Sequence, residues 1–227
     1  MPLRHHEHTT QTIQLTYYTT GEEPRLLIAS GIHGDEYESI ELVRQAIEKH
    51  HTYMPPLLFI PAVSPSAVAK QTRHNSECVD VNRYFYCNSP IREVCAVQAL
   101  LSNHRFDHCI SFHEDPAQEH FYLYDSGEFC NLQNFVKFKS ELQNIGIPLL
   151  NGIDDPNDPL LGHLVTDGYV SIAPGKFLKN SGPFEIWLIN KIISQRVIAP
   201  EIPGKLPLAL KQEIIDLFFR HIVLELS

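Results

Sequence analysis

The sequence lacks the cysteine and basic-residue patterns that mark several common classes of protein. Its five cysteines are odd in number and form no CxxC pair, which argues against a disulfide framework and against a cysteine zinc site. Reduced thiols in a cytosolic protein are the simpler interpretation. The formal net charge is −9 and no Lys/Arg cluster occurs, so nucleic acid is not expected as a partner.

Long apolar runs and linkers are also missing. No stretch approaches the ~18 consecutive apolar residues that a membrane-spanning helix needs. The polar N-terminus, MPLRHHEHTTQT, has no apolar core of a signal peptide, so we expect a cytoplasmic protein. Its histidines, His5, His6 and His8, are expected to be disordered. Without an internal repeat or a low-complexity linker, residues 1–227 are expected to form a single domain.

Apolar patterning along the chain predicts strands that alternate with helices, which indicates a layered α/β fold. In such sheets ligands bind at the carboxyl ends of the strands. Between the last predicted elements lies an acidic loop at 151–159, which we interpret as a solvated surface loop, although its Asp154, Asp155 and Asp158 could instead favour a cationic substrate group. Strands are predicted at 11–18, 26–30, 57–63, 106–112, 168–173 and 182–189, and helices at 36–50, 90–103, 128–144 and 208–226.

Three side chains form a candidate metal site. His33 and Glu36 follow the predicted strand at 26–30 and lie three residues apart at a strand-to-helix turn. His113, in the segment SFHED, follows another predicted strand. Catalytic zinc takes three protein ligands and keeps a fourth position open for water, so the two histidines and the glutamate are a suitable set. An HxxE pair occurs by chance in a chain with thirteen histidines, so the pair alone is a weak signal.

Further motifs follow in a specific order: VDVNRYF at 79–85, SFHED at 111–115 and GPFEIW at 182–187. In this order the motifs resemble the zinc carboxypeptidase family, including its aspartoacylase and succinylglutamate desuccinylase relatives. The resemblance spans about 26–187. It implies a three-layer α/β/α fold with a mixed, mostly parallel central sheet. It also implies one Zn²⁺ per chain, held by His33, Glu36 and His113.

The resemblance also implies roles for residues around the metal. Asp80 would accept a hydrogen bond from a metal-bound imidazole and fix its tautomer. Asn82 and Arg83 would bind the free carboxylate of the substrate, a task that suits the planar fork of arginine. Glu185, read as part of an apolar strand, would be the general base and acid.

Two assignments leave alternatives open. Arg73 would stabilise the oxyanion that develops on the scissile carbonyl, but Arg92 or Arg105 could compete for this role. Tyr169 is the nearest candidate for the catalytic tyrosine of digestive carboxypeptidases, or else a strand residue. Two acidic neighbours of the ligands, Asp35 and Glu114, are expected to be solvated bystanders.

The leading functional hypothesis is a zinc-dependent, carboxypeptidase-like amide hydrolase that cleaves a bond next to a free carboxylate with an activated water. An alternative is an N-acyl amino acid deacylase of the aspartoacylase or succinylglutamate desuccinylase kind. A third is a metal-binding or interaction protein that has lost catalysis. The expected partner is a small peptide or an N-acyl amino acid, with neither nucleic acid nor membrane, and the sequence leaves the oligomeric state open.

Overall fold

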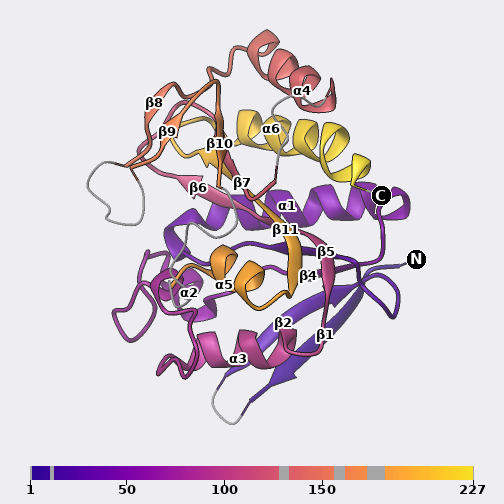
Figure 1. Cartoon of the computed structure of the whole chain (residues 1–227), viewed down its shortest axis with the longest axis vertical. Helices are drawn as coiled ribbons and strands as arrows, with labels where there is room; N and C mark the ends of the chain where they lie inside the picture. The colour runs from indigo at the N-terminus through magenta and orange to yellow at the C-terminus, as the bar shows by residue number, and fades with distance from the viewer. Residues whose placement is uncertain (1, 11–12, 128–132, 156–161, 173–181, 227) are drawn as a thin grey trace.

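The computed structural model describes residues 2–10, 13–127, 133–155, 162–172 and 182–226. Within these ranges the strands of the main sheet are β1 (Arg4–Thr9), β2 (Gln14–Thr19), β3 (Leu26–Ala29), β4 (Leu57–Ile60), β5 (Phe106–Ser111), β6 (His113–Asp115), β7 (Tyr122–Asp125), β10 (Tyr169–Ser171) and β11 (Ser194–Pro203). They are arranged in the order β1-β2-β4-β3-β5-β11-β7-β10, and β6 pairs with β11 outside this path (Figure 1). The short strands β8 (Gly152–Ile153) and β9 (Leu164–Val165) form a separate antiparallel pair.

The main sheet is mixed and mostly parallel, as the resemblance implied. Its centre, β4-β3-β5-β11, is parallel throughout, and β6 joins β11 in the same direction. The antiparallel pairs are β1 with β2, β2 with β4, and β11 with β7, while β10 returns to a parallel pairing with β7. Because the central strands are parallel, their carboxyl ends meet at one edge of the sheet.

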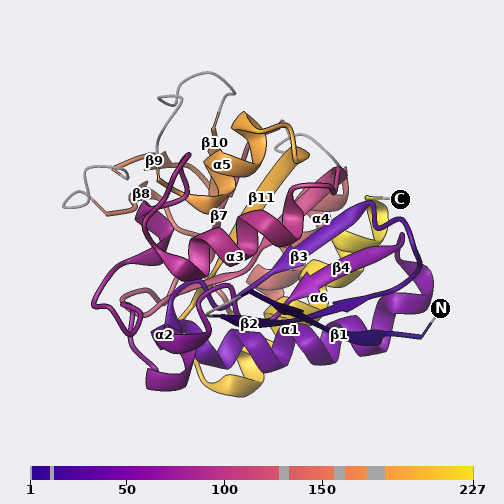
Figure 2. The ribbon, with the colours of Figure 1, turned by 90° about the horizontal axis from the view of Figure 1, so that it is seen from below.

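Helices cover both faces of this sheet. They are α1 (Tyr37–His50), α2 (Pro65–Lys70), α3 (Arg92–Leu101), α4 (Gln133–Asn144), α5 (Phe184–Asn190) and α6 (Leu208–His221), with short 3-10 turns η1 (Gly34–Glu36), η2 (His51–Tyr53), η3 (Val81–Arg83) and η4 (Val223–Glu225). The views in Figures 1 and 2 place α1, α4 and α6 on one side, and α3 and α5 on the other.

Alternation along the buried strands explains the three layers. On β3, Leu26 and Ile28 belong to the apolar cluster under α1, α4 and α6, whereas Leu27 and Ala29 belong to the cluster under α3 and α5. Successive side chains of a strand point to opposite faces, so a strand apolar at every position is buried from both sides. The expected three-layer α/β/α fold is confirmed.

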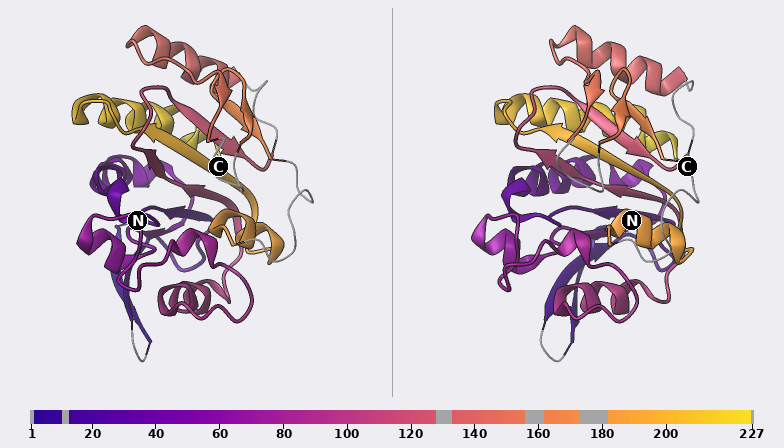
Figure 3. Two further views of the ribbon diagram at one scale, coloured as in Figure 1. Left: turned by 90° about the vertical axis from the view of Figure 1, so that its left-hand side faces the viewer. Right: turned by 60° about the vertical axis from the view of Figure 1, so that its left-hand side comes forward.

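The N-terminal segment differs from the prediction. His5, His6 and His8 were expected in a disordered terminus, but they lie in β1, which pairs antiparallel with β2. The two strands form a hairpin at the edge of the sheet, beside α3 (Figure 3). The His6 ring stacks on Tyr17, and its Nε2 lies 2.9 Å from the Thr19 hydroxyl. Because β1 is an edge strand without a buried apolar face, its residues are polar, and no apolar pattern in the sequence predicted it.

The segment at 182–189 was predicted to be a strand, and this prediction is wrong. Residues Phe184–Asn190 form α5, with Pro183 at the N-cap position. Its buried residues, Phe184, Trp187 and Leu188, have the i, i+3, i+4 spacing of one helical face. A seven-residue apolar run does not by itself distinguish a buried strand from a short helix.

Other boundaries agree with the predictions to within a few residues. The helix predicted at 208–226 is α6 followed by η4, and the helix predicted at 128–144 is α4, with 128–132 outside the described residues. The described cysteines, Cys78, Cys87, Cys95 and Cys109, are free thiols. Among the described helices, none combines the length and the apolar composition needed to cross a bilayer. The single-domain organisation and the cytoplasmic location stay predictions.

Candidate metal centre and its pocket

His33 and Glu36 are positioned by the turn that follows β3. Gly31 adopts a φ of +63°, and a Cβ there would come within 2.8 Å of the carbonyl oxygen of Pro61, so the turn requires glycine. The chain then enters η1, which brings the two side chains together: His33 Nδ1 lies 2.5 Å from Glu36 Oε1. Both side chains are buried.

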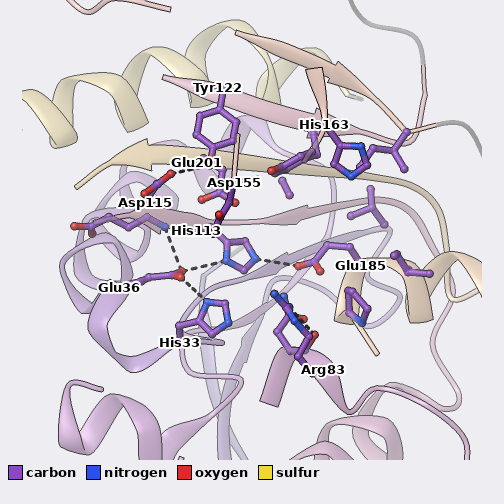
Figure 4. A pocket seen from close by; sticks show the side chains of 18 of the residues that line it. His33, Glu36, Arg83, His113, Asp115, Tyr122, Asp155, His163, Glu185 and Glu201 are labelled. Atoms are coloured by element: carbon purple, nitrogen blue, oxygen red, sulfur yellow. Dashed lines mark hydrogen bonds and ion pairs between the residues drawn. The ribbon is translucent and has the colours of Figure 1, made fainter. Parts of the chain in front are cut away.

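His113 completes the group from the neighbouring strand end. Its Nδ1 lies 3.1 Å from the other carboxylate oxygen of Glu36, so the glutamate is held between the two imidazoles (Figure 4). One ligand atom from each of His33, Glu36 and His113 lies within 4.8 Å of the others. Three residues that were predicted from two separate motifs therefore converge on one small volume.

The far nitrogen of each imidazole is held by a carboxylate. His33 Nε2 lies 3.2 Å from Asp80 Oδ1, and His113 Nε2 lies 3.0 Å from Glu185 Oε1. Because Glu36 faces the Nδ1 atom of both imidazoles, each ring nitrogen of the pair lies beside a carboxylate, which only accepts hydrogen bonds. A metal bound by Glu36 would take the place of the hydrogen on each Nδ1, and each Nε2 would keep its hydrogen bond to Asp80 or Glu185. Carboxylate partners of this kind orient metal-binding histidines. The donor set and its orientation thus fit a divalent transition metal.

The charges of the group also favour a cation between the ligands. Burial lowers the pKa of His33 and of His113, but the surrounding carboxylates together outweigh burial, so both pKa values lie above the ordinary one: Glu36 and Asp80 act on His33, and Glu36, Glu185 and Glu201 act on His113. Burial raises the pKa of Glu36, and the two imidazoles lower it well below its usual range. A bound metal would replace the imidazole protons as the positive charge beside Glu36.

The segment from Asp80 to Arg83, which has the pattern DxNR, connects this group to the pocket wall. Asp80 caps η3 by accepting a hydrogen bond from the backbone N–H of Asn82, at 3.0 Å. The Asn82 side chain accepts from the backbone N–H of Phe184, at 2.8 Å, and so holds the start of α5. Arg83 lines the pocket, and Figure 4 shows its side chain pointing into it.

Of the three arginines considered for the oxyanion, only Arg73 lines the described part of the pocket. Its Nη2 lies 2.9 Å from Asp80 Oδ2, and its side chain is 39% exposed. Arg92 pairs with the surface residue Glu77, and Arg105 bonds backbone carbonyls near the end of α3. The position of Arg73 is therefore compatible with the predicted role, which stays a prediction.

Glu185 lies beside the metal group, but on a helix instead of a strand. Its Oε1 accepts hydrogen bonds from His113 Nε2 and from the Ser111 hydroxyl, the latter at 2.6 Å. Burial raises the pKa of Glu185, but the hydrogen bond and charge of His113 outweigh burial and lower this pKa to about 2. In this arrangement the carboxylate orients an imidazole, and its predicted role in proton transfer stays a prediction.

A second carboxylate, Glu201, was missed by the sequence analysis. It lies on β11 directly opposite His113 of β6 on one side and Tyr122 of β7 on the other. It lines the pocket and is half-buried. The available signal was a single acid in the apolar segment VIAPEIP, because a carboxylate is costly to bury unless it is paired or protonated.

The predicted placement of Tyr169 in the substrate site is corrected. Tyr169 lies on β10, is 9% exposed and packs its ring against Phe135 in the core. Its hydroxyl donates to Asp125 Oδ2 at 2.8 Å, and the residue is not among the described residues that line the pocket. Tyr122 and Tyr124 of β7 line the pocket instead, because their parity on that strand turns them toward it.

One residue of the acidic loop, Asp154, is less solvated than expected. Asp154 is 8% exposed, and its carboxylate accepts from the Tyr124 hydroxyl and from the backbone N–H groups of Gly162 and His163. Asp155 lines the pocket, whereas Asp158 lies outside the described residues. The composition of the loop did not predict that Asp154 is buried, because this burial depends on a contact with Tyr124 of β7.

Glu114 is also not a solvated bystander. It is 6% exposed, and its carboxylate lies 2.6 Å from Nζ of Lys211, a lysine of α6 that is itself 2% exposed. Lys211 contacts Glu38 of α1 as well, at 2.6 Å. The backbone N–H of Glu114 donates to Glu36 Oε2, so this buried ion cluster lies directly behind the metal group. Asp35, the other expected bystander, is half-buried.

Replacing Lys211 by methionine is expected to lower the free energy of unfolding by about 3–5 kcal/mol, because the change leaves the buried Glu114 carboxylate without its cation. Chemical denaturation monitored by circular dichroism measures this loss. The matched control is Lys205→Met, at an exposed lysine just before α6, which should stay within about 0.5 kcal/mol of the parent. A loss below about 1 kcal/mol for Lys211→Met would show that the pair contributes little.

Comparison with known proteins gives a family match and several similar folds. Residues 22–128 match the family model described as Succinylglutamate desuccinylase/Aspartoacylase catalytic domain. This range contains His33, Glu36, the DxNR motif and His113, so the resemblance predicted from those motifs is confirmed. None of the curated proteins compared with the chain matches it.

Solved structures share the fold at low sequence identity. A putative metallopeptidase from Shewanella amazonensis SB2B has a TM-score of 0.73 and 20% identity, covering 99% of this chain and 87% of its own. A metallo-carboxypeptidase from Burkholderia cenocepacia has a TM-score of 0.62 and 13% identity, covering 97% and 64%. A succinylglutamate desuccinylase from Silicibacter sp. TM1040 has a TM-score of 0.59 and 12% identity, covering 94% and 60%.

Proposed function

We propose that this relative of the succinylglutamate desuccinylase/aspartoacylase catalytic domains is a zinc-dependent hydrolase that cleaves an amide bond beside a free carboxylate. The family match supports hydrolase activity of the peptidase or acylase type. The observation that carries the proposal is the group of His33, Glu36 and His113, in which both imidazoles offer Nδ1 to one point while carboxylates hold their Nε2 atoms.

Zinc is the proposed metal because two histidines and one glutamate, with a position left open, are a typical catalytic zinc set. When bound, zinc supplies a Lewis acid that polarises the scissile carbonyl and lowers the pKa of the attacking water. Asp80 and Glu185 keep the two imidazoles in the ligating orientation throughout the reaction.

Glu201 is the proposed general base and acid. It faces the same pocket as the metal group and lies opposite His113 in the sheet register. Burial raises its pKa to about 8, although the charge of His113 acts in the opposite direction. A pKa near neutrality suits a group that takes a proton from water and returns it to the leaving amine. Glu185 remains the alternative base, and the two are distinguished experimentally below.

Arg83 is the proposed anchor for the substrate carboxylate, since its guanidinium enters the pocket from η3. Arg73, at the metal end of the same pocket, is proposed to stabilise the oxyanion of the tetrahedral intermediate. Asn82 already uses its carbonyl oxygen to hold α5, so its amide N–H₂ is the part left for substrate.

Metal content and hydrolysis together test the proposal. The purified protein is analysed for metal as isolated and after chelation and reconstitution with zinc. It is then assayed on N-acyl amino acids, on dipeptides and on the same dipeptides with an amidated C-terminus. We expect one zinc per chain, activity that follows zinc, and loss of activity on the amidated substrates. Zinc-loaded protein without activity on any substrate would favour a metal-binding or interaction protein.

Replacing Arg83 by alanine is expected to raise KM by about 10–100-fold with a smaller effect on kcat, because hydrogen bonds to a charged group contribute about 1.5–3 kcal/mol. Steady-state kinetics on the best substrate measures the change. Arg92→Ala, at the arginine that pairs with Glu77 on the surface, is the matched control and should leave KM unchanged. Equal kinetics for both variants would contradict the anchoring role.

An N-acyl amino acid deacylase is the second candidate function, favoured by the family to which residues 22–128 match. A peptidase and a deacylase share the same metal and base, and they differ in what lies on the acyl side of the scissile bond. The ratio of kcat/KM for acetylated or succinylated amino acids to kcat/KM for dipeptides therefore decides between them.

A further inference from the structure

The pocket, with a volume of about 450 Å³, is lined by apolar side chains on α5, β11 and the end of β10, beside which Asp125 and Ser126 also line it. This apolar wall consists of Ile186 and Ile189 of α5, Val197 and Ala199 of β11, and Ile172 at the end of β10. The two β11 residues are buried, whereas the three isoleucines are half-buried and partly open to the cavity. An apolar surface inside a binding pocket is available to an apolar part of the ligand.

The apolar wall begins at the candidate base. Val197, Ala199 and Glu201 alternate along β11 and all line the pocket. A strand rises about 3.3 Å per residue, so Ala199 and Val197 lie about 7 and 13 Å from Glu201. Tyr122 and Tyr124 accompany them on β7, opposite Glu201 and Ala199 in the register. The cavity thus runs from the metal group along β11.

The other end of the apolar wall adjoins the proposed carboxylate anchor. A Cβ on Gly182 would come within 1.8 Å of the carbonyl oxygen of Arg83, so the two backbones are in direct contact. The backbone N–H of Phe85 donates to the Gly182 carbonyl at 2.8 Å. Because α5 begins just after Gly182, Ile186 and Ile189 lie within the next two turns from Arg83.

The charges of the pocket are unevenly distributed. Among its described lining residues, Arg73 and Arg83 are the only arginines and there is no lysine. Both arginines act electrostatically on Asp80, beside His33. Nearby on β11, Arg196 is outside this lining, and its guanidinium forms two hydrogen bonds to Asp125. A second substrate carboxylate at the apolar wall would therefore be buried without a described cation.

We propose that the apolar wall of α5 and β11 receives the side chain of the residue that bears the substrate carboxylate, so that this residue is leucine- or phenylalanine-like rather than aspartate- or glutamate-like. The inference rests on the proposed function, since it takes Arg83 as the anchor and the metal group as the place of the scissile carbonyl. It specifies what that function leaves open, namely the class of amino acid that is released.

Kinetics on matched substrates test the inference. Zinc-loaded protein is assayed on N-acetyl and glycyl derivatives of leucine, phenylalanine, aspartate and glutamate. We expect kcat/KM to be at least about 10-fold higher for the two apolar residues. A preference for aspartate or glutamate with robust hydrolysis would overturn the inference and leave the proposed function intact.

Two lysine variants distinguish an effect on the apolar wall from a general effect of introducing a lysine. Ile189→Lys places a cation on the wall and is expected to lower kcat/KM for the apolar substrates by at least about 10-fold. The ratio of kcat/KM for the apolar substrates to kcat/KM for the acidic substrates should therefore fall, or drop below one. Ile192→Lys, just beyond α5 and 72% exposed, should leave both unchanged. Zinc content reports whether each variant has folded. An unchanged preference in folded, zinc-loaded Ile189→Lys contradicts the inference.

If no substrate is cleaved, the affinities of two ligands still test the inference. Calorimetric titration of zinc-loaded Glu201→Gln protein with N-acetyl-leucine and N-acetyl-aspartate compares the two affinities without turnover. Tighter binding of the leucine derivative, together with no hydrolysis by the parent protein, would support the apolar wall and reject the proposed hydrolase. Tighter binding of the aspartate derivative would reject the apolar wall whether or not hydrolysis occurs.

Discussion

Replacing Glu201 by glutamine is expected to lower kcat by about 10²–10⁴-fold, the usual contribution of general acid–base catalysis. The amide keeps the shape of the side chain but cannot take a proton from the attacking water. Because Glu201 is outside the group of His33, Glu36 and His113, zinc content should stay at the parent level. Steady-state kinetics and metal analysis of the same preparation measure both quantities.

Glu185→Gln is the matched control, since it removes a carboxylate from the other side of His113. It should weaken zinc affinity by about 10–100-fold through the imidazole that Glu185 orients, and kcat of the fully loaded enzyme should fall less than in Glu201→Gln. The opposite pattern, with Glu185→Gln inactive at full zinc occupancy and Glu201→Gln active, would restore Glu185 as the general base and overturn the assignment of Glu201.

Replacing His113 by alanine is expected to remove nearly all bound zinc and, with it, at least about 10⁴-fold of the activity, because water activation at neutral pH depends on the metal. The change also leaves Glu36 and Glu185 without the imidazole between them. Metal analysis after dialysis against micromolar zinc measures the loss. His74→Ala, at an exposed histidine, is the control and should keep full metal and activity.

Full zinc occupancy in His113→Ala would contradict the metal centre itself. Partial zinc occupancy of His113→Ala at high zinc concentration is compatible with the metal centre, because His33 and Glu36 remain on one turn, with His33 Nδ1 2.5 Å from Glu36 Oε1. A circular dichroism spectrum equal to that of the parent excludes loss of zinc through unfolding. The chelated parent protein should have the same low activity as the variant, and zinc should restore only the parent.

The buried parallel strands β3 and β4 were predictable because their apolar runs are continuous, whereas β11, which pairs parallel with β5, was not predicted. On β3 and β4 every residue is buried, and turn residues follow each strand. The helical spacing of Val43 and Ile47 predicted α1, and both residues are fully buried. A strand that is buried on both faces has a continuous apolar run, and a helix that is buried on one face has apolar residues at helical spacing. Both patterns can be read from the sequence, and the structure agrees with them.

Prediction failed where periodicity is absent or ambiguous. The segment FEIWLIN is apolar except for Glu185 and Asn190, and in the folded protein Phe184 and Trp187 pack against Phe85, a contact that the local sequence does not show. The polar residues of β1 gave no signal, because pairing with β2 supplies the hydrogen bonds that hold it. Glu201 was overlooked although its strand, β11, lies between β5 and β7 in the sheet.

The sequence by itself determined the layered α/β fold and the composition of the candidate metal site. His33 and Glu36 are local to one turn, and His113 lies two residues after the end of β5, so the parallel order of β3 and β5 brings the three residues together. Only the tertiary structure decided which acid orients an imidazole and which faces the pocket. That choice depends on the direction of α5 and on the register of β11 beside β6 and β7, and both are set by long-range packing that no local pattern encodes.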